Sequence, residues 1–263
     1  MAKTPKLFRP EPGVTYSKTQ VNKAGETLRD YYFVNRYGEK VSEDVPQEDI
    51  DAAVEAMRCL HWWRSTHADP MSNARASLWY HVSKATSLDP KVAQRLKRVP
   101  TIIDKLEREP EMKLARMADI AGVRAQLPSI DSVYAVARRL KKNWTIKKEH
   151  DYIKSPKPSG YRAYHLIASK SSRLVEVQLR TFRQGAWANS VEKDGRIEGA
   201  GYKFGRGEDS VLAYYAMLAE AFAAMDAGEQ IDPDLREEIN DRYHDLQKST
   251  PVEGEAAGEQ GHG

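Results

Sequence analysis

The stretch Leu174–Thr181, LVEVQLRT, decides the fold class, because it is an apolar run of strand length with a carboxylate, Glu176, inside it. Three further stretches upstream are predicted as strands: Ala118–Leu127, Trp144–Asp151 and Tyr161–Ser169. Between the first two of these, Ser129–Asn143 has a helical pattern that begins at a capping serine. Together these elements predict an α/β (α+β) fold, a mixed β-sheet flanked by helices.

Helical patterns occupy much of the remaining chain. Downstream of the last strand, helices are predicted over Arg183–Glu192, Ser210–Ala227 and Asp234–Lys248. Upstream, apolar residues recur at three- and four-residue steps from Gln47 to about Lys84, with a break at Asp69-Pro70 before a second helix over Asn73–Ser83. Two short helices are expected to follow, over Pro90–Arg98 and Thr101–Arg108. Residues 1–45 show no clear period.

These patterns predict three segments. Residues 1–85 form a partly helical N-terminal extension, and 86–249 form the main domain with its C-terminal helices. Residues 250–263 are rich in Gly and Glu and are expected to be a disordered tail.

Composition excludes several classes of protein. The 263 residues carry 41 Lys/Arg against 38 Asp/Glu, and 40% are hydrophobic, as in an ordinary globular domain. No apolar run approaches the ~20 residues of a membrane span, and the N-terminus shows no signal segment. A single cysteine, Cys59, rules out an internal disulfide and fits a reducing compartment. We therefore expect a cytoplasmic protein that does not bind a membrane.

Charge is distributed unevenly along the chain. Residues 91–150 contain 15 Lys/Arg against 7 Asp/Glu, whereas 224–263 contain 3 against 11. A basic middle region favours an anionic ligand such as nucleotide phosphates or RNA. The acidic C-terminal region is interpreted as a solvated helix and tail.

Two carboxylates, Asp119 and Glu176, lie in predicted apolar strands. A charge beside the core is costly unless it is paired or binds metal. Neighbouring strands could bring both carboxylates to one Mg²⁺, which takes one or two carboxylates together with phosphate oxygens. The alternative is that each carboxylate forms an ion pair with an arginine on the open face of the sheet.

A basic cluster follows at a predicted helix–helix corner. Arg95, Lys97 and Thr101 are close in sequence, and Lys105 lies one helical turn beyond Thr101 on the same face. Three cations and a hydroxyl directed to one point suit a polyphosphate. The alternative is an ordinary solvated basic face.

A third candidate is the loop Ser155–Gly160, which contains two prolines and presents Lys157. Tyr161 follows the loop, and His165, four residues on, is expected on the same face of the strand. An aromatic ring beside a cation suits stacking on a nucleobase. The alternative is that the tyrosine only packs in the core.

The order and spacing of these blocks carry a resemblance to a known family. They comprise Arg-x-Lys-x3-Thr-x3-Lys from Arg95, Asp-Ile-Ala-Gly-Val-Arg from Asp119, the run from Asp151 to His165 and Glu-x-Gln-x-Arg-Thr from Glu176, with Trp187-Ala188 and Tyr202-Lys203 beyond. Over about 90–205, the sequence resembles the RelA/SpoT family of pyrophosphokinases, which synthesise (p)ppGpp-type alarmones. The resemblance implies a small, single-function synthetase that moves the β,γ-pyrophosphate of ATP to the ribose 3′-hydroxyl of GDP or GTP.

The resemblance also implies roles on the donor side of the reaction. Arg95 and Arg124 would hold the adenine between them. The triphosphate would be bound by the remaining residues of the basic cluster: Lys97, Thr101 and Lys105. Asp119 and Glu176 would bind Mg²⁺.

On the acceptor side, the resemblance makes Glu176 the base for the attacking hydroxyl. Tyr161 would stack on the acceptor base, with Lys157 and His165 near its phosphates or ribose. Gln178 and Arg180 lie on the same strand as Glu176 and would support the acceptor site.

Two departures from the family pattern leave the acceptor open. Gly185 stands where some guanosine-specific members place a polar side chain near the base, and the stretch from Glu192 to Lys203 is atypical and rich in glycine. The alternative function is a toxin of a toxin–antitoxin pair that pyrophosphorylates the 3′ end of tRNA. It is supported by a basic stretch over 138–148 in which Trp144 is interleaved. An antitoxin protein and a second copy of the chain are further partners considered. A catalytically dead relative is disfavoured because Asp119 and Glu176 are both present.

Overall fold

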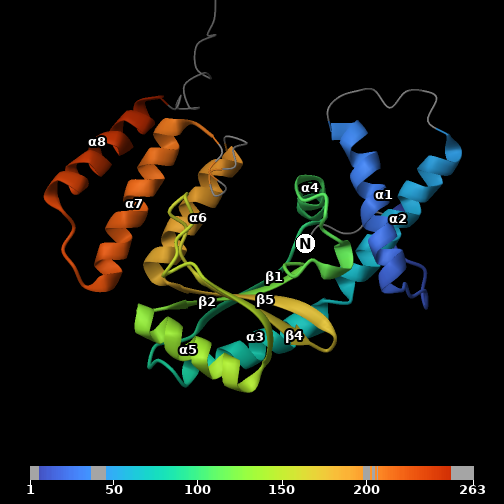
Figure 1. The fold of residues 1–263 in the computed structure, drawn as a ribbon, viewed down its shortest axis with the longest axis horizontal. Helices are drawn as coiled ribbons and strands as arrows, with labels where there is room; N and C mark the ends of the chain where they lie inside the picture. Colours follow the sequence, from blue (N-terminus) through green and yellow to red (C-terminus); the bar gives the residue numbers. More distant parts are fainter. Residues whose placement is uncertain (1–5, 37–45, 198–201, 203–204, 206, 250–263) are drawn as a thin grey trace, which may run out of the picture. The chain divides into compact units, whose positions relative to one another are not determined.

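The computed structural model describes residues 6–36, 46–197, 202, 205 and 207–249 (Figure 1). The predicted tail 250–263 and Lys203 lie outside these residues. Contacts divide the chain into two compact units. Unit 1 comprises Met1–His150 and Tyr164–Arg180, and unit 2 comprises Asp151–Ala163 and Thr181–Gly263. The division at residue 85 that we expected for the domains stays a prediction.

Unit 1 contains the sheet and five of the α-helices. In chain order its elements are α1 (Lys18–Arg36), α2 (Gln47–Ser65), α3 (Ala68–Ser83), β1 (Lys91–Leu96), α4 (Val99–Arg108), β2 (Ala121–Leu127), α5 (Ile130–Asn143), β3 (Thr145–Asp151), β4 (Tyr164–Lys170) and β5 (Arg173–Thr181), with short 3₁₀ turns at Lys6–Phe8 and Leu114–Arg116. Unit 2 contains α6 (Phe182–Ile197), α7 (Asp209–Ala227) and α8 (Pro233–Ser249).

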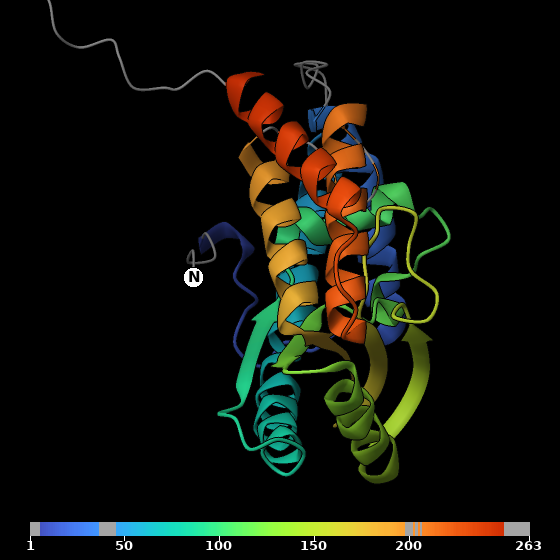
Figure 2. The same ribbon diagram turned by 90° about the vertical axis from the view of Figure 1, so that its left-hand side faces the viewer.

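The five strands form one sheet in the order β1-β2-β5-β4-β3. Strands β1 and β2 pair antiparallel, and so do β4 and β5. Along β5, Val175, Val177 and Leu179 are fully buried, while Glu176 and Gln178 between them are half-buried. Helices α3 and α5 pack side by side against this sheet (Figure 2). The alternation therefore gives the sheet one helix-covered face and one more open face.

Helix α5 begins where the sequence predicts. Ser129 is its N-cap, and the hydroxyl oxygen accepts a hydrogen bond from the backbone N–H of Ser132. Val133, Val136 and Leu140 then recur at helical spacing and are completely buried.

A second apolar cluster joins α1, α2 and α4 within unit 1. Leu28 of α1, Leu60 of α2 and Ile103 and Leu106 of α4 are almost fully buried in it. Burying side chains of this size stabilises the folded state by roughly 1.5–3 kcal/mol each. The N-terminal helices are thereby fixed to α4.

Unit 2 has an aromatic core of its own. Tyr161, Trp187 and Tyr215 are each at most 3% exposed, and the Trp187 indole donates to the Tyr215 carbonyl over 2.7 Å. Gly160 has φ +83°, and a Cβ there would lie 2.6 Å from the Cβ of Ala219. The chain can therefore make this turn against α7 only with a glycine.

The predicted helix over Pro90–Arg98 is wrong, because this stretch forms the edge strand β1. Its two half-buried apolar residues, Val92 and Leu96, are four residues apart and imitate a helical period. Pairing with β2 from Lys91↔Gln126 to Leu96↔Ala121 decides the conformation.

Three smaller expectations also need correction. The N-terminal 45 residues contain the helix α1, whose buried Val21, Ala24 and Leu28 lie at helical spacing. The break between two helices that we expected at Asp69-Pro70 lies about one turn earlier, between the end of α2 at Ser65 and the start of α3 at Ala68. Pro70 is accommodated in the first turn of α3. Strands β2 and β4 begin at Ala121 and Tyr164, each three residues later than the predicted starts at Ala118 and Tyr161.

No helix in the described part of the chain is both long enough and apolar enough to cross a membrane.

Candidate active site

The candidate site lies on the open face of the sheet in unit 1. The β4–β5 register pairs His165 with Gln178 and Ile167 with Glu176, so the three polar side chains share one face. On the other side of the sheet centre, β1 pairs Arg95 with Gly122 and Ala93 with Arg124. Because Gly122 and Arg124 are two residues apart on β2, Arg95 and Arg124 lie on a common face of the sheet. The residues of β2 on this face are half-buried, whereas those on its opposite face are buried.

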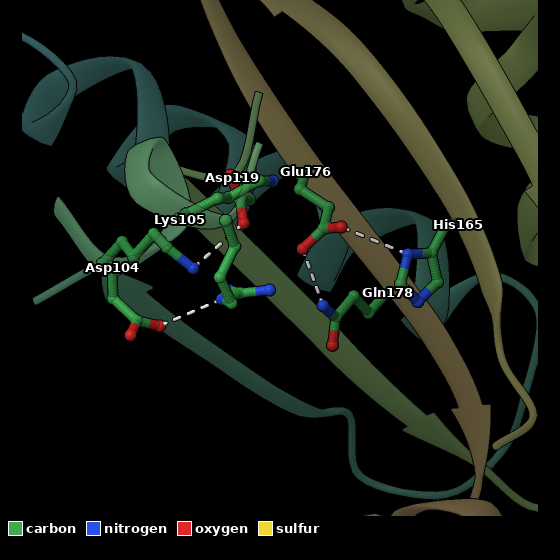
Figure 3. Close-up of polar contacts among 8 residues, drawn as sticks. Asp104, Lys105, Asp119, His165, Glu176 and Gln178 are labelled. Atoms are coloured by element: carbon green, nitrogen blue, oxygen red, sulfur yellow. Dashed lines mark hydrogen bonds and ion pairs between the residues drawn. The ribbon is translucent and has the colours of Figure 1, made fainter. Parts of the chain in front are cut away.

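Asp119 does not lie within a strand, as we expected, but in the turn that immediately precedes β2. Its carboxylate is held between two lysines, and the contact with Lys105 is drawn in Figure 3. Nζ of Lys97 lies 3.1 Å from Oδ2, and Nζ of Lys105 lies 3.1 Å from Oδ1. The turn is fixed by the Lys97 backbone N–H, which donates to the Ile120 carbonyl over 2.8 Å. The partners of Asp119 are thus the lysines of the basic cluster rather than an arginine.

Glu176 has different partners on each oxygen (Figure 3). Nδ1 of His165 lies 3.1 Å from Oε1, and Nε2 of Gln178 donates to Oε2 over 2.7 Å. Burial by itself would raise the pKa of this carboxyl, but the contacts with His165 and Gln178 and the charge of Lys105 lower it to about 2. Glu176 is therefore ionised throughout the neutral range.

Gln178 is oriented by Arg180. Nη2 of Arg180 donates to Oε1 of Gln178 over 2.6 Å. Because an arginine can only donate hydrogen bonds, the amide oxygen of Gln178 must face Arg180, and the amide NH₂ group then faces Glu176. Arg180 is 1% exposed. It supports Glu176 through Gln178, and no direct contact from Arg180 to Glu176 is needed.

Helix α4 places Thr101 and Lys105 one turn apart beside this site. Arg95 precedes them on the exposed edge strand β1, so the basic cluster lies at a strand–helix corner and not at the helix–helix corner that we expected. Asp104, next to Lys105 on α4, pairs with Arg108 over 3.3 Å (Figure 3). Lys105 contacts Asp119 and lowers the pKa of Glu176, so a single ammonium group acts on both carboxylates.

Two arginines of the N-terminal helices, which no sequence pattern indicates, hold the backbone of the basic cluster and of α4. Nε of Arg64, in α2, donates to the carbonyl of Lys97 over 2.7 Å. Arg29, in α1, donates to the carbonyl of Leu106 over 2.9 Å and to that of Met112 over 3.1 Å. All three hydrogen bonds connect segments that are distant in sequence and end on backbone carbonyls, and no spacing or motif in the sequence predicts them.

Lys157 and Tyr161 belong to unit 2. Nζ of Lys157 lies 4.8 Å from the ring centre of Tyr152 and 5.4 Å from that of Tyr161. Because β4 begins only at Tyr164, Tyr161 is not on the same strand as His165, and its ring is 2% exposed. The pairing of an aromatic ring with a cation was expected. The assignment of Tyr161 to the acceptor base, and of Lys157 to the phosphates or ribose of the acceptor, stays a prediction.

Metal binding can be judged from the two carboxylates. Among the described residues, no group of three His, Cys, Asp or Glu side chains could hold a metal ion. Mg²⁺ does not require such a group, because it keeps waters and takes one or two carboxylates plus substrate phosphates. Asp119, which contacts Lys105, and Glu176, whose pKa the charge of Lys105 lowers, are two carboxylates that fit that kind of site.

Comparison with known proteins agrees with this geometry. Residues 94–197 match the family described as "Region found in RelA / SpoT proteins". The chain contains a RelA/SpoT-family region. The matched range includes the site residues from Arg95 to Arg180, whereas Arg29 and Arg64 lie outside it.

The RelA/SpoT region also resembles curated proteins. It is 35% identical over 109 residues to the GTP pyrophosphokinase YjbM of Bacillus subtilis. The aligned stretch covers 37% of this chain and 52% of that protein. It is 36% identical over 115 residues to the GTP pyrophosphokinase YwaC of the same organism, covering 38% and 54%. The chain thus spans about half the length of these relatives.

Solved structures show the same fold. Small alarmone synthetase 1 from Bacillus subtilis, bound to its product pppGpp, superposes with a TM-score of 0.52 at 24% identity, over 71% of this chain and 99% of that one. A GTP pyrophosphokinase family protein from Streptococcus pneumoniae gives a TM-score of 0.52 at 23% identity, over 71% and 95%. The predicted mixed sheet with flanking helices is confirmed.

Proposed function

We propose that this chain is an ATP-dependent pyrophosphokinase that transfers the β,γ-pyrophosphate of ATP to the ribose 3′-hydroxyl of a guanosine nucleotide. The observation that carries the proposal is the pair of carboxylates that share Lys105, one held by lysines and the other by His165 and Gln178. The likeness to two GTP pyrophosphokinases supports the same reaction.

ATP binds, in this proposal, at the strand–helix corner. Lys97 and Lys105 exchange Asp119 for the triphosphate oxygens, and Thr101 adds a hydroxyl donor one turn away from Lys105. Arg95 and Arg124 share the face beside them and hold the adenine. Arg64 and Arg29 keep the backbone of this corner in place.

In the transfer step, the 3′-hydroxyl oxygen attacks the β-phosphorus while the bond from that phosphorus to the oxygen bridging the α- and β-phosphates breaks. AMP leaves with that oxygen, and Glu176 accepts the hydroxyl proton. A pKa of about 2 makes Glu176 a weak base. It is sufficient where the transition state is loose and little covalent assistance is required. The cations of the basic cluster, once they have moved onto the triphosphate, stabilise the charge that develops on the phosphate oxygens.

Asp119 and Glu176 are the residues that would hold Mg²⁺, which would neutralise phosphate charge when bound. The release of Asp119 by both lysines, once these bind phosphate, would free its two oxygens for the ion. His165, which contacts Glu176, lies on the acceptor side of the reaction in this proposal.

The test is label transfer from γ-³²P-ATP with Mg²⁺ to GDP, GTP or deacylated tRNA, each offered in a separate reaction. Label on a guanosine nucleotide is the expected result. The variant Glu149→Gln, which changes an exposed glutamate on β3, is the matched control for Glu176→Gln and should retain transfer. Absence of transfer to all three acceptors would contradict the proposal.

A 3′ end of tRNA is the second candidate acceptor, within a toxin neutralised by an antitoxin. It is favoured by basic residues that remain exposed on α5 and β3: Arg138, Lys142, Lys147 and Lys148. Trp144 does not contribute to that surface, because it is 7% exposed and its Nε1 donates to Ser77. The expectation that an aromatic ring is interleaved with these cations is therefore wrong. Transfer to tRNA and not to GDP or GTP would select this alternative.

A further inference from the structure

The helix-covered face of the sheet contains a cluster of basic groups that the proposed reaction does not use. Lys170 ends β4, and the register pairs it with Arg173 and places it on the face of Ala168 and Val175, opposite to that of Glu176. Its Nζ lies 3.7 Å from the ring centre of Trp144. Burial lowers the pKa of Lys170, so its charge is partly removed from water.

His81 of α3 lies against the same indole. The ring centres of His81 and Trp144 are 6.3 Å apart, and the imidazole is 6% exposed. Its Nδ1 is buried without a hydrogen-bond partner among the described residues. Burial and the charges of Arg139 and Lys170 lower the pKa of His81. Arg139 lies on α5, which contacts α3, the helix that carries His81.

Arg139 of α5 and Ser77 of α3 add hydrogen-bond donors. Nε of Arg139 is buried and has no hydrogen-bond partner in the described part of the chain. Ser77 lies one helical turn from His81, and its oxygen accepts from Nε1 of Trp144 over 3.1 Å. A hydroxyl that accepts one hydrogen bond keeps its own proton to donate.

The cluster lacks a counter-charge. Within residues 6–36, 46–197 and 207–249, no carboxylate forms an ion pair with Lys170 or Arg139. Two cations and two unpartnered buried nitrogens in one place are unfavourable unless an anion or water completes them. A water can satisfy single nitrogens but does not neutralise two charges.

We propose that Ser77, His81, Arg139 and Lys170 form a second anion site, which takes a phosphate group on the side of the sheet away from Glu176. Phosphate fits because it accepts several hydrogen bonds at once from cationic and hydroxyl donors. The site is separate from the proposed ATP corner, and its existence does not depend on the proposed reaction. The phosphate belongs either to a free inorganic anion or to a nucleotide.

The ring of Trp144 is a local reporter of the site. Whole protein labelled with 5-fluorotryptophan is followed by ¹⁹F NMR, and Trp144→Phe identifies the resonance of Trp144. Orthophosphate, pyrophosphate and GDP are titrated separately, with sodium chloride holding the ionic strength constant. A saturable shift of this resonance is expected with at least one of the three, and the absence of any saturable shift would overturn the proposal.

Variants then locate the binding. Lys170→Gln and Arg139→Gln should each weaken binding at least about tenfold, as expected for losing a charge-assisted hydrogen bond. Lys142→Gln, an equal change of charge at an exposed site on α5, should leave the affinity unchanged. Equal weakening in all three variants would reject the site. So would loss of the Trp144 shift in Lys97→Ala, because that would assign the effect to the ATP corner.

The three ligands separate the two sources of phosphate. Shifts with orthophosphate or pyrophosphate support a site for free inorganic anions. A shift with GDP alone supports a nucleotide site.

Discussion

The two carboxylates of the candidate site are held in contrasting ways. Asp119 lies in a turn, and its partners are the ends of two lysine side chains, each with four rotatable bonds. Glu176 lies in the middle of β5, and its partners are short side chains from β4 and β5 themselves. One carboxylate can exchange its partners easily and the other cannot.

This contrast indicates a division of labour. The lysines that hold Asp119 can move to an incoming polyphosphate without disturbing the sheet. Glu176 keeps its position and its negative charge, because Arg180 fixes Gln178 and Gln178 fixes the carboxylate. A group-transfer reaction needs cations that can follow the phosphates and a proton acceptor that stays in place. The lysines around Asp119 meet the first need, and Glu176 meets the second.

The largest effect is expected at the stationary carboxylate. Glu176→Gln removes the charge and the proton acceptor with little change of shape, and kcat for pyrophosphate transfer should fall by about 10²–10⁴-fold. ATP binding, measured by calorimetry, should change little. A variant with wild-type kcat would show that Glu176 is not the base.

A smaller effect is expected at the shared lysine. Lys105→Met should lower kcat/KM about 10- to 100-fold, because a charge-assisted contact to phosphate is lost. Steady-state kinetics with ATP as the varied substrate measures it, and Lys148→Met, at an exposed position on β3, is the control. Equal losses in both variants would mean that only overall charge matters.

The hydrogen bond to Glu176 should appear in the pH profile. His165, Gln178 and Lys105 together lower the pKa of Glu176 to about 2. Gln178→Leu removes one of these contributions, so that pKa should rise. Because the ionised form is required, kcat/KM falls as pH falls through this pKa, and the fall should begin at a higher pH in the variant. Gln126→Leu, a half-buried glutamine on β2, is the control. An unchanged profile with a raised KM for the acceptor would instead assign Gln178 to acceptor binding.

The smallest effect is expected at a residue that touches neither carboxylate. Arg64→Met removes the donor to the Lys97 carbonyl, and KM for ATP should rise about three- to tenfold. Arg58→Met is a close control, because Arg58 is on the same helix and donates to the Leu7 carbonyl over 3.0 Å. Arg64→Lys should restore part of the affinity. An effect on thermal stability alone would contradict a positioning role.

Much of the sheet could be predicted from the sequence, because its central strands are apolar runs bounded by turns. The buried core of β5 and the Ser129 cap of α5 are examples. The edge strand β1 could not be predicted in this way, because an exposed strand lacks the alternation of apolar and polar residues that burial of one face imposes. Only the pairing of β1 with β2 defines it as a strand. The same holds for Asp119, whose apolar neighbours Ile120 and Ala121 suggested a longer strand.

The residue types of the candidate site could be predicted better than their partners. Local spacing places Glu176, Gln178 and Arg180 on one strand, but the direction of the hydrogen bonds depends on Arg180 being a pure donor. Arg64 and Arg29 bind backbone carbonyls, which every residue has, so the sequence holds no signal for their partners. Such contacts become visible only in three dimensions.

The close approach of Gly160 to Ala219 has a consequence for synthesis on the ribosome. Unit 2 is built from two separated segments, and the turn at Gly160 packs on a helix that is translated about 60 residues later. At roughly 5–20 residues per second, that helix emerges about 3–12 s after the turn. Strands β4 and β5 are made in this interval, so they are available to pair before the preceding loop has a surface to pack on.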